Sequence, residues 1–330
     1  MPARAGAADP GRPSTRAGVT LIEILVVIVI LSMILGMTIG ILRNANRDLG
    51  VLAAANTVAA QLRATAEHAR AEASPAWVVL DLEGRTIGTL TRETIGMWHF
   101  EDRMGAFGKE ANPKGPVIVP GRVGNCYRFK MNETVDCGEV PVYRPDQGVG
   151  IELWFHRVLR GNKHIIASIG KDVEVWADAQ GKVTARVGAS QVTSGIVTVP
   201  REMWVYLQAI HNGRELKLLL NGTEVGSIPC RHEWKEAGRF IVGSAKDGLA
   251  GMIDEVRLSL VIPRDTYPLP PQVEFELPKG SKVADGEYLI AFDGGGRLEA
   301  GRHPSALTFT IKSPAASKTI TITRQGLVLR

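Results

Sequence analysis

Apolar residues form one continuous segment near the N-terminus, and a regularly spaced apolar pattern follows it. Residues 19–42 read VTLIEILVVIVILSMILGMTIGIL, apolar except for Glu23 and a few small hydroxyl-bearing residues. As a helix with a rise of about 1.5 Å per residue, the segment spans about 36 Å, enough to cross a bilayer core of about 30 Å. Polarity rises after Leu42. Apolar residues then recur at the three- and four-residue steps of a helical stripe, at Val51, Leu52, Ala55, Val58, Ala59, Leu62, Ala66, Ala69 and Ala73.

This pattern predicts one long helix, half membrane span and half amphipathic. It ends at Ser74-Pro75, because the residue before a proline is pushed out of the helical region. Short strands and turns follow: 77–82 and 85–90 predict a hairpin around Glu83-Gly84, and the C-terminal strands are predicted at 288–292, 306–311, 319–323 and 327–329. The glycine run 294–296 is interpreted as a hairpin turn, since neither a helix start nor a Lys-Ser/Thr pair follows it.

The middle of the chain is rich in short strands separated by turn signals such as Asn212-Gly213 and Asn221-Gly222. Strands at this spacing indicate an antiparallel sandwich. A Pro-rich stretch, 263–272, is interpreted as a linker that returns the chain to the first unit. The ends of a domain often lie close together, so insertion of one domain into a hairpin of another is sterically reasonable. The strands of the sandwich are predicted at 151–155, 165–169, 173–177, 183–187, 204–211, 216–220, 240–242 and 252–258.

Glu23 stands out inside the apolar segment. A carboxylate deep in a bilayer costs roughly 2.5–3.5 kcal/mol, so an intramembrane acid is a functional candidate by default. A plain signal anchor would not need it. An ordinary secretory signal peptide has an apolar core of about 7–15 residues and an A-x-A cleavage site, and this segment is longer and has no such site after it. Residues 1–18 carry three arginines and one acid, which favours a cytoplasmic N-terminus.

The junction Gly18-Val19-Thr20-Leu21-Ile22-Glu23 resembles the cleavage and methylation motif of type IV prepilins. The resemblance implies that a prepilin peptidase cuts after Gly18 and methylates the new amino terminus at Val19. Family members usually begin with Phe or Met, so Val19 departs from the pattern. Glu23 is then the fifth mature residue, near the positive end of the helix dipole. A neighbouring subunit's free amine would neutralise it, which makes Glu23 an assembly residue.

The phrase AEHARAEASPAWVVLDLEG resembles the helix-to-sheet passage of H-type minor pseudopilins of type II secretion systems, and the chain ends with a similar arrangement of strands. The middle resembles a laminin-G-like, concanavalin-type jelly roll. The phrases that carry this second resemblance are GMWHFED (96–102), GRVGNCYRF (121–129), IELWFHR (151–157), 203–227 and FIVGSAKDGLAGMIDEVRLS (240–259).

Related jelly-roll domains often bind glycans or protein partners, sometimes through calcium. This sequence has no dense carboxylate loop of the DxDxDG kind. Asp254 is a candidate cation ligand, but hydrogen bonding at a turn or strand end is the favoured interpretation, and no cofactor is predicted. Trp154, Trp176 and Trp204 are interpreted as core residues, with ligand stacking as the alternative. A hydrolase is disfavoured, because Glu152 and Glu174 lie on separate predicted strands with no evident pairing.

Composition adds two limits. The net charge of +5 is small for 330 residues, and no basic stripe with interleaved aromatics is present, so nucleic-acid binding is not predicted. The three cysteines, Cys126, Cys137 and Cys230, include no CxxC pair, which argues against a zinc site. In an exported body, Cys126 and Cys137 either form a disulfide or remain small buried residues, and the sequence does not choose between the two.

The predicted fold class is α+β: a long N-terminal pilin helix packed on a small antiparallel sheet, with an inserted all-β concanavalin/laminin-G-like sandwich. The predicted divisions are the leader 1–18, membrane segment 19–42, amphipathic helix and first strands 43–92, inserted jelly roll 93–262, linker 263–272 and C-terminal strands 273–330.

The predicted function is that of a non-enzymatic minor pseudopilin or pilin-like subunit of a type II secretion or type IV pilus-type system. The alternative is a membrane-anchored adhesin that binds carbohydrate or protein. The predicted partners are prepilin peptidase, other pilins or pseudopilins and a glycan or protein ligand. The predicted location is the bacterial inner membrane, crossed once, with the body outside the cytoplasm.

Overall fold

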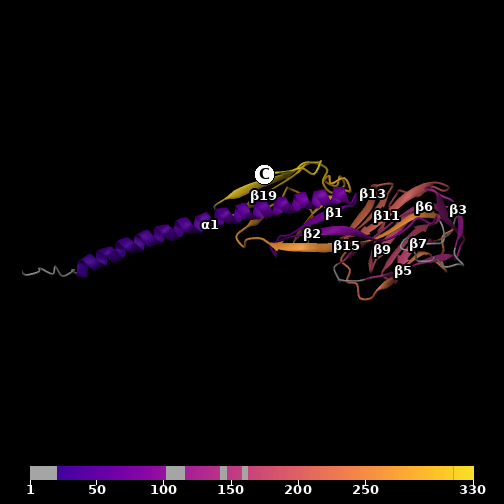
Figure 1. Cartoon of the computed structure of the whole chain (residues 1–330), viewed down its shortest axis with the longest axis horizontal. Helices are drawn as coiled ribbons and strands as arrows, with labels where there is room; N and C mark the ends of the chain where they lie inside the picture. The colour runs from indigo at the N-terminus through magenta and orange to yellow at the C-terminus, as the bar shows by residue number, and fades with distance from the viewer. Residues whose placement is uncertain (1–20, 102–115, 142–146, 158–162, 315) are drawn as a thin grey trace, which may run out of the picture.

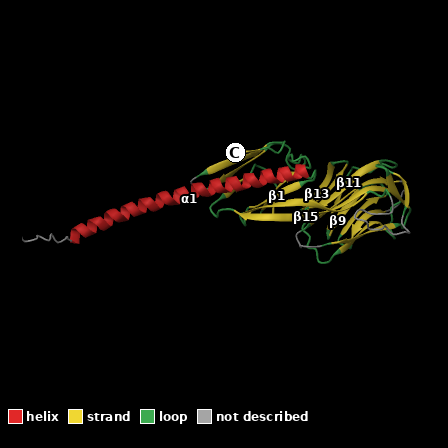
Figure 2. Cartoon of the chain, in the orientation of Figure 1, coloured by secondary structure: helices red, strands yellow, loops and turns green. Residues whose placement is uncertain are grey.

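The computed structural model of the chain describes residues 21–101, 116–141, 147–157, 163–314 and 316–330, with the backbone alone for 39–48. One long helix extends from a β-rich body, and the inserted strands form the end of the body farthest from the start of the helix (Figure 1). Figure 2 shows the same division between a single helix and many strands. The predicted processing residues Gly18 and Val19 lie outside the described residues.

Helix α1 runs from Leu21 to Ala71, 51 residues without interruption. It ends at Ala71, three residues before the predicted stop at Ser74, through a left-handed residue: Ala73 has φ 45°, and the N–H of Ser74 bonds to the carbonyl of Ala69 at 3.0 Å. This six-to-one hydrogen bond is the usual way in which a helix satisfies its last carbonyls. The predicted single long helix is confirmed.

The second half of α1 packs on strands from two sheets, as the apolar stripe predicts. Leu62 and Val58 are fully buried, whereas Leu52, which the sequence places in the same stripe, lies at its edge and is 43% exposed. The stripe meets β1, β2 and β18 on one side and β19, β20 and β21 on the other. The side chains that the sheets contribute to this core include Val78, Leu80, Ile87, Ile290, Phe292, Phe309, Ile311, Ile320 and Ile322.

The described strands form three antiparallel sheets. The largest has the order β13-β12-β11-β6-β15-β2-β1-β18-β17, with β4 also paired to β15 and β3 to β4. Its strands are β1 (Ala76–Asp81), β2 (Thr86–Trp98), β3 (Val117–Pro120), β4 (Asn125–Phe129), β6 (Gly148–Arg157), β11 (Trp204–His211), β12 (Glu215–Leu220), β13 (Thr223–Pro229), β15 (Gly251–Pro268), β17 (Val283–Ala284) and β18 (Glu287–Phe292).

A six-stranded sheet faces the inserted part of the large sheet and completes the sandwich around one apolar core. Its order is β10-β9-β8-β7-β14-β5, with β5 (Thr134–Val140), β7 (Lys163–Ile169), β8 (Val173–Asp178), β9 (Val183–Val187), β10 (Ser190–Thr193) and β14 (Gly238–Gly243). The third sheet lies beside α1 and has the order β16 (Glu274–Glu276), β19 (Leu307–Lys312), β20 (Ser317–Ile322) and β21 (Val328–Leu329). The predicted fold class is confirmed.

Two long strands join the inserted sandwich to the helix-bearing unit. β2 and β15 pair along their length, from Val256 opposite Trp98 to Pro268 opposite Thr86. Residues 263–268, predicted as part of a Pro-rich linker, are therefore the last residues of β15, and the predicted divisions at 92/93 and 262/263 fall inside strands. The linker prediction is wrong here, because β2 supplies a strand partner that a local proline signal does not reveal.

The glycine run forms a turn that contacts α1 directly. Gly295 and Arg297 donate their backbone N–H groups to the carboxylate of Asp293, at 2.8 and 3.0 Å. A Cβ on Gly294 would lie 2.7 Å from the carbonyl oxygen of Ala73, and Gly296 has φ 68° next to the backbone of Ala66. The run is therefore needed for a close approach of backbone to the helix, in agreement with the turn prediction.

Candidate functional site

The first half of α1 is an apolar rod that the rest of the described chain does not cover. Its window from Leu21 to Thr38 has a mean hydropathy of 2.7 and is 0% buried. Glu23 lies in the first helical turn, as predicted. The buried stripe begins only at Val51. The length and composition of this half are sufficient for a bilayer span.

The inserted sandwich is held against the helix-bearing unit by a contact that we call the joint. Its apolar part is a small buried cluster made by Trp77, Val79, Leu90, Ile210, Val261, Leu289 and Ala291, with Leu219 packed against it. Trp77 and Leu289 come from β1 and β18 of the helix-bearing unit, whereas Ile210 comes from β11 of the sandwich. The large sheet therefore bends so that its two ends face each other.

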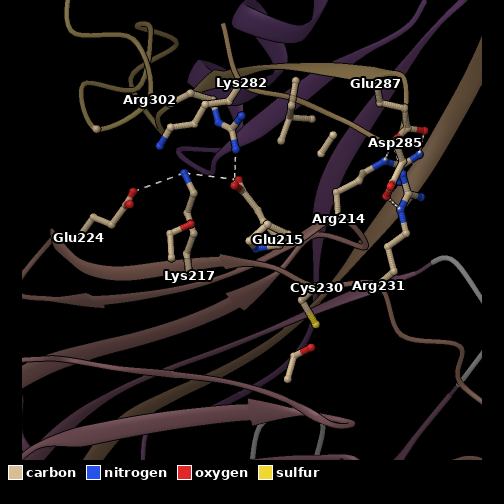
Figure 3. Close-up of a pocket in the computed structure, with 16 residues that line it drawn as sticks. Arg214, Glu215, Lys217, Glu224, Cys230, Arg231, Lys282, Asp285, Glu287 and Arg302 are labelled. Atoms are coloured by element: carbon tan, nitrogen blue, oxygen red, sulfur yellow. Dashed lines mark hydrogen bonds and ion pairs between the residues drawn. The ribbon is translucent and has the colours of Figure 1, made fainter. Parts of the chain in front are cut away.

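A charged cavity of about 500 Å³ opens beside this cluster (Figure 3). At its centre Lys217 of β12 is 5% exposed and lies 2.5 Å from Glu299, with Glu215 and Glu224 each 3.5 Å away. Three carboxylates surround this ammonium group and raise its pKa, against the effect of burial. Arg302, which also lines the cavity, pairs with Glu215.

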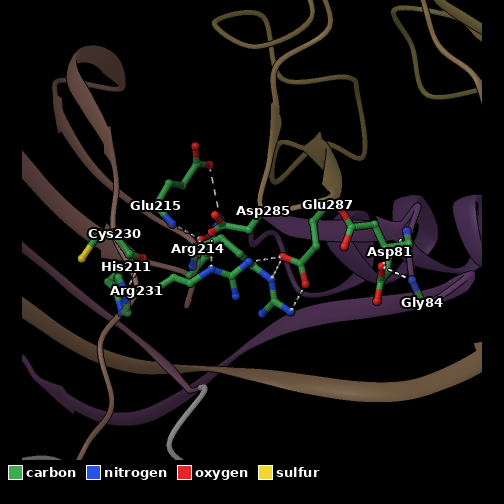
Figure 4. A network of polar contacts seen from close by, with 11 residues as sticks. Asp81, Gly84, His211, Arg214, Glu215, Cys230, Arg231, Asp285 and Glu287 are labelled. Atoms are coloured by element: carbon green, nitrogen blue, oxygen red, sulfur yellow. Dashed lines mark hydrogen bonds and ion pairs between the residues drawn. The ribbon is translucent and has the colours of Figure 1, made fainter.

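A second set of ion pairs crosses the joint nearby (Figure 4). Arg214 of the sandwich donates two hydrogen bonds to the carboxylate of Glu287, at 3.1 and 3.3 Å. Arg231 bonds to Glu287 and Asp285, each at 2.8 Å. The joint is thus an apolar contact bordered by charges that pair across it. We did not predict these residues: an alternating strand such as Glu215-Leu216-Lys217 indicates a polar outer face but not what covers it.

His303 lies beside the cavity charges and is 6% exposed. Its Nε2 accepts the backbone N–H of Ala291 at 3.3 Å. Burial, helped by Arg302 and Lys217, lowers the pKa of His303 from 6.5 to about 4, so this imidazole is neutral at pH 7.

The strand register creates a different surface at the far end of the large sheet, on the side away from the sandwich core. We call it the outer face. Met252 lies opposite Arg128 on one side and His156 on the other, and His156 lies opposite Trp204. In the next row, Trp154 lies opposite Tyr206.

The aromatic rings of the outer face contact one another and a cation. The ring centroids of Trp154 and Tyr206 are 5.2 Å apart, and those of His156 and Trp204 are 5.3 Å apart. The guanidinium of Arg122 lies 4.9 Å from the centre of the Trp154 ring. The structure therefore corrects the interpretation of Trp154 and Trp204 as core residues. Both are partly exposed here, and Trp176 is likewise partly exposed, on the outer side of the six-stranded sheet.

A buried polar group lies under one edge of the outer face. Glu152 is 3% exposed, forms an ion pair with Arg92, and accepts the hydroxyl of Tyr206 and the amide of Gln208. Burial is the main reason that the pKa of Arg92 falls to about 10. The second carboxylate weighed in the sequence, Glu174, lies in the other sheet and pairs with Lys163 at 2.8 Å. These two acids do not share a cleft.

Asp254 is fully buried and holds a turn. Its Oδ2 accepts the backbone N–H groups of Arg122 and Val123, both at 2.9 Å, and its Oδ1 accepts that of Glu255 at 2.8 Å. This carboxylate therefore accepts hydrogen bonds at a turn, which is the interpretation that the sequence favours over cation binding. Among the residues that the structure describes, no group of three or more His, Cys, Asp or Glu side chains is arranged to hold a metal ion.

The three cysteines are free and buried. Cys126 lies in β4 and Cys137 in β5, which belong to different sheets, so the disulfide alternative is not realised in this structure. Burial raises the pKa of Cys126 to about 12 and that of Cys137 further still. Both are therefore unreactive thiols.

Comparison with known proteins supports both the N-terminal helix and the inserted sandwich as predicted. Residues 13–39 match the prokaryotic N-terminal methylation motif, and residues 133–260 match the concanavalin A-like lectin/glucanases superfamily. The chain therefore carries a prepilin-type motif followed by a laminin-G/concanavalin A-like domain. The motif and the apolar helix together indicate a membrane-anchored bacterial protein. No curated protein matches the chain.

Solved structures resemble the sandwich only distantly. Domain 4 of AbnA, a GH43 extracellular arabinanase from Geobacillus stearothermophilus in complex with arabinotriose, is 14% identical, with a TM-score of 0.42, over 51% of this chain and 92% of that one. Trypanosoma rangeli sialidase is 12% identical, with a TM-score of 0.40, over 50% of this chain and 30% of the sialidase. The binding domain of botulinum neurotoxin DC is 7% identical, with a TM-score of 0.37, over 69% and 73%. None of these similarities carries an argument about activity.

Proposed function

We propose that this protein is a non-enzymatic minor pilin-like subunit of a type II secretion or type IV pilus-type system, and that it displays a binding domain. One observation carries the proposal: a single helix begins at a prepilin-type motif, leaves its first half uncovered, and buries its second half in the body. In a simple membrane anchor, the helix would not need to continue into the core of the exported domain.

In this proposal a prepilin peptidase cuts after Gly18 and Val19 becomes the amino terminus. The apolar half of α1 then lies in the inner membrane, and the body lies outside the cytoplasm. In a filament, the same apolar half packs against the helices of other subunits. The amine of a neighbour neutralises Glu23, which removes the cost of a charged carboxylate in an apolar surrounding.

The inserted sandwich is the displayed part. It connects through the paired strands β2 and β15 and through the joint, so its position relative to α1 is fixed by two strands and by side-chain contacts. A subunit with so large a projection suits a minor, specialised position more than the repeating wall of a filament.

The direct test is to express the full chain with and without a prepilin peptidase and to determine the mature N-terminus by mass spectrometry. We expect an N-terminus at Val19 only when the peptidase is present. Processing at any other residue would refute the pilin-like assignment.

The role of Glu23 needs a separate variant. Glu23→Ala should be cut normally but should co-purify with partner pilins at about a tenth of the wild-type level or less, because the unpaired amine of a neighbour would be left in an apolar surrounding. The matched control is Glu72→Ala, which should assemble normally. Glu72 is an exposed acid directly after the C-terminal end of α1. Normal assembly of Glu23→Ala would remove the proposed role.

A second candidate function is a membrane-anchored adhesin that uses the pilin motif only for insertion. The aromatic outer face and the lectin-like family match favour it. The two functions separate by cross-linking in cells: a filament subunit gives cross-links between its apolar helix and other pilins, whereas an isolated adhesin gives none.

A further inference from the structure

We propose that the outer face of the large sheet binds an acidic polysaccharide, whose sugar rings lie on Trp154, Tyr206 and Trp204 and whose carboxylates or sulfates bind the surrounding arginines. The inference rests on the proposed display of a binding domain and names both its site and its ligand class.

The outer face presents an aromatic surface. Trp154, Tyr206, His156 and Trp204 come from two neighbouring strands and remain partly exposed. Large aromatic rings are normally buried in a core, as Trp98 is here at 6% exposure. Rings held side by side on a rigid sheet offer flat apolar surfaces that need no reordering on binding. Such surfaces fit the apolar faces of pyranose rings.

The outer face also carries cationic side chains. Arg122, Arg128 and Arg257 surround the rings, and in the described part of the chain neither Arg128 nor Arg257 forms an ion pair. The neighbouring acids are already engaged: Glu152 pairs with Arg92, and Asp254 accepts three backbone N–H groups.

Two further acids lie near this face: Glu255 is 2.9 Å from Nδ1 of His99, and Glu101 accepts the backbone N–H of Asn125 at 3.0 Å. The carboxylates of Glu152 and Asp254 are buried, whereas the guanidinium groups of Arg122 and Arg128 are exposed beside the rings and can reach a bound ligand. Arginine binds carboxylate and sulfate groups through two parallel hydrogen bonds, so an anionic ligand is favoured over a neutral one.

The outer face is long enough for a chain-like ligand. The rows cross β4, β15, β6 and β11, which at strand spacings of about 4.8 Å gives a path of about 14 Å. A chain-like ligand can lie along this path and meet a cation, a ring and another ring in turn. A basic and aromatic surface also suits single-stranded nucleic acid. The lectin-like family match favours a glycan, and DNA therefore serves as a competing probe.

The other sheet provides a matched control within the same chain. Trp176 of β8 is partly exposed, and the ammonium group of Lys163 lies 4.4 Å from its ring centre. This pair repeats the tryptophan and cation of the outer face. Its charge is compensated, however, because Lys163 also bonds to Glu174 at 2.8 Å. We expect no polysaccharide binding there.

The experiment uses the full chain in detergent micelles and measures binding by tryptophan fluorescence and calorimetry. The probes are polygalacturonate, hyaluronate and heparin, with fully methyl-esterified polygalacturonate as a neutral polymer of the same backbone and oligo-dT as the nucleic acid. At least one acidic polysaccharide should bind at least about tenfold more tightly than the neutral polymer, and its affinity should fall with added salt.

The variants locate the site. Trp154→Ala and the double variant R122Q/R128Q should each weaken that binding about tenfold or more, whereas the matched variants Trp176→Ala and Lys163→Gln should leave it unchanged. Thermal melting checks that each variant is folded. R122Q/R128Q alters only exposed side chains, so it tests the site even if Trp154→Ala fails to fold.

Three results would overturn the proposal. They are equal affinity for charged and esterified polygalacturonate, tighter binding of oligo-dT than of any acidic polysaccharide, and an equal loss of affinity in the variants of the outer face and in those at Trp176 and Lys163. None of these outcomes bears on cleavage after Gly18. The failure of this inference is therefore distinguishable from the failure of the pilin-like function.

Discussion

The strands β1, β2 and β18 of the large sheet carry two attachments of different chemistry. On one side α1 packs against them through aliphatic and aromatic side chains in one continuous apolar core. On the other side the inserted sandwich meets them through a few apolar residues bordered by ion pairs that involve Lys217, Arg214 and Arg231.

Because of this difference, the two contacts should respond differently to pH and salt. Apolar burial depends little on pH or salt, whereas exposed ion pairs weaken in salt and buried titratable groups respond to pH. The helix contact should therefore be constant under most conditions. The ion pairs of the joint should weaken in high salt, and its buried titratable groups should weaken it in acid.

The largest effect is expected at the helix contact. Leu62→Ala removes a fully buried side chain and should destabilise the packing of α1 by about 2–5 kcal/mol. Leu52→Ala, at the exposed edge of the same stripe, should cost less than about 1 kcal/mol. Urea unfolding in micelles, with hydrogen exchange of β1 as a local readout, measures both. Equal losses in the two variants would show that the packed half of α1 is not the stabilising contact.

Acid should weaken the joint selectively. The pKa of His303 in the folded protein is about 4, below the unfolded value of about 6.5, so the unfolded state takes up the proton first. The stability from this group is complete above pH 6.5 and is lost as the pH falls toward 4, by at most about 3 kcal/mol.

Hydrogen exchange of β18 at pH 7 and pH 4.5 measures this loss. His303→Gln keeps an acceptor for the N–H of Ala291 but does not titrate, so its exchange should change less with pH. If wild type and variant respond equally, His303 is not the acid-sensitive group.

The smallest effects are expected among the ion pairs, and they should rank by burial. Lys217→Met removes a 5% exposed cation from Glu299, Glu224 and Glu215, of which Glu215 keeps its ion pair with Arg302, and should destabilise the joint by about 1–3 kcal/mol after allowance for the partly exposed acids. Arg231→Gln removes a 48% exposed partner and should cost no more than about 1 kcal/mol, with little cost left in high salt. The same exchange experiment measures both, and the reverse order would contradict the assignment of Lys217 as the centre of the joint.

The sequence alone determined the features that depend on local pattern. The run at 19–42, the position of Glu23 and the stripe after Val51 predicted the helix, because helical periodicity follows from residue spacing. Alternation and turn signals predicted most strands of the sandwich and, in the helix-bearing unit, the turn at the glycine run. The motif around Gly18 and the jelly-roll phrases indicated the two families that the comparisons support.

Tertiary structure decided the rest. Residues 263–268 became strand because β2 offers backbone partners, although their prolines locally favour a linker. Trp154 and Trp204 were predicted in the core but lie on the outer face. Strand register sets the side of the sheet that each side chain occupies, and a shift of one residue would reverse it. The charges of the joint likewise acquire partners only when the sheet bends and brings β12 to β18. Contacts between residues so distant in sequence have no local signal, and they determine where the displayed domain sits.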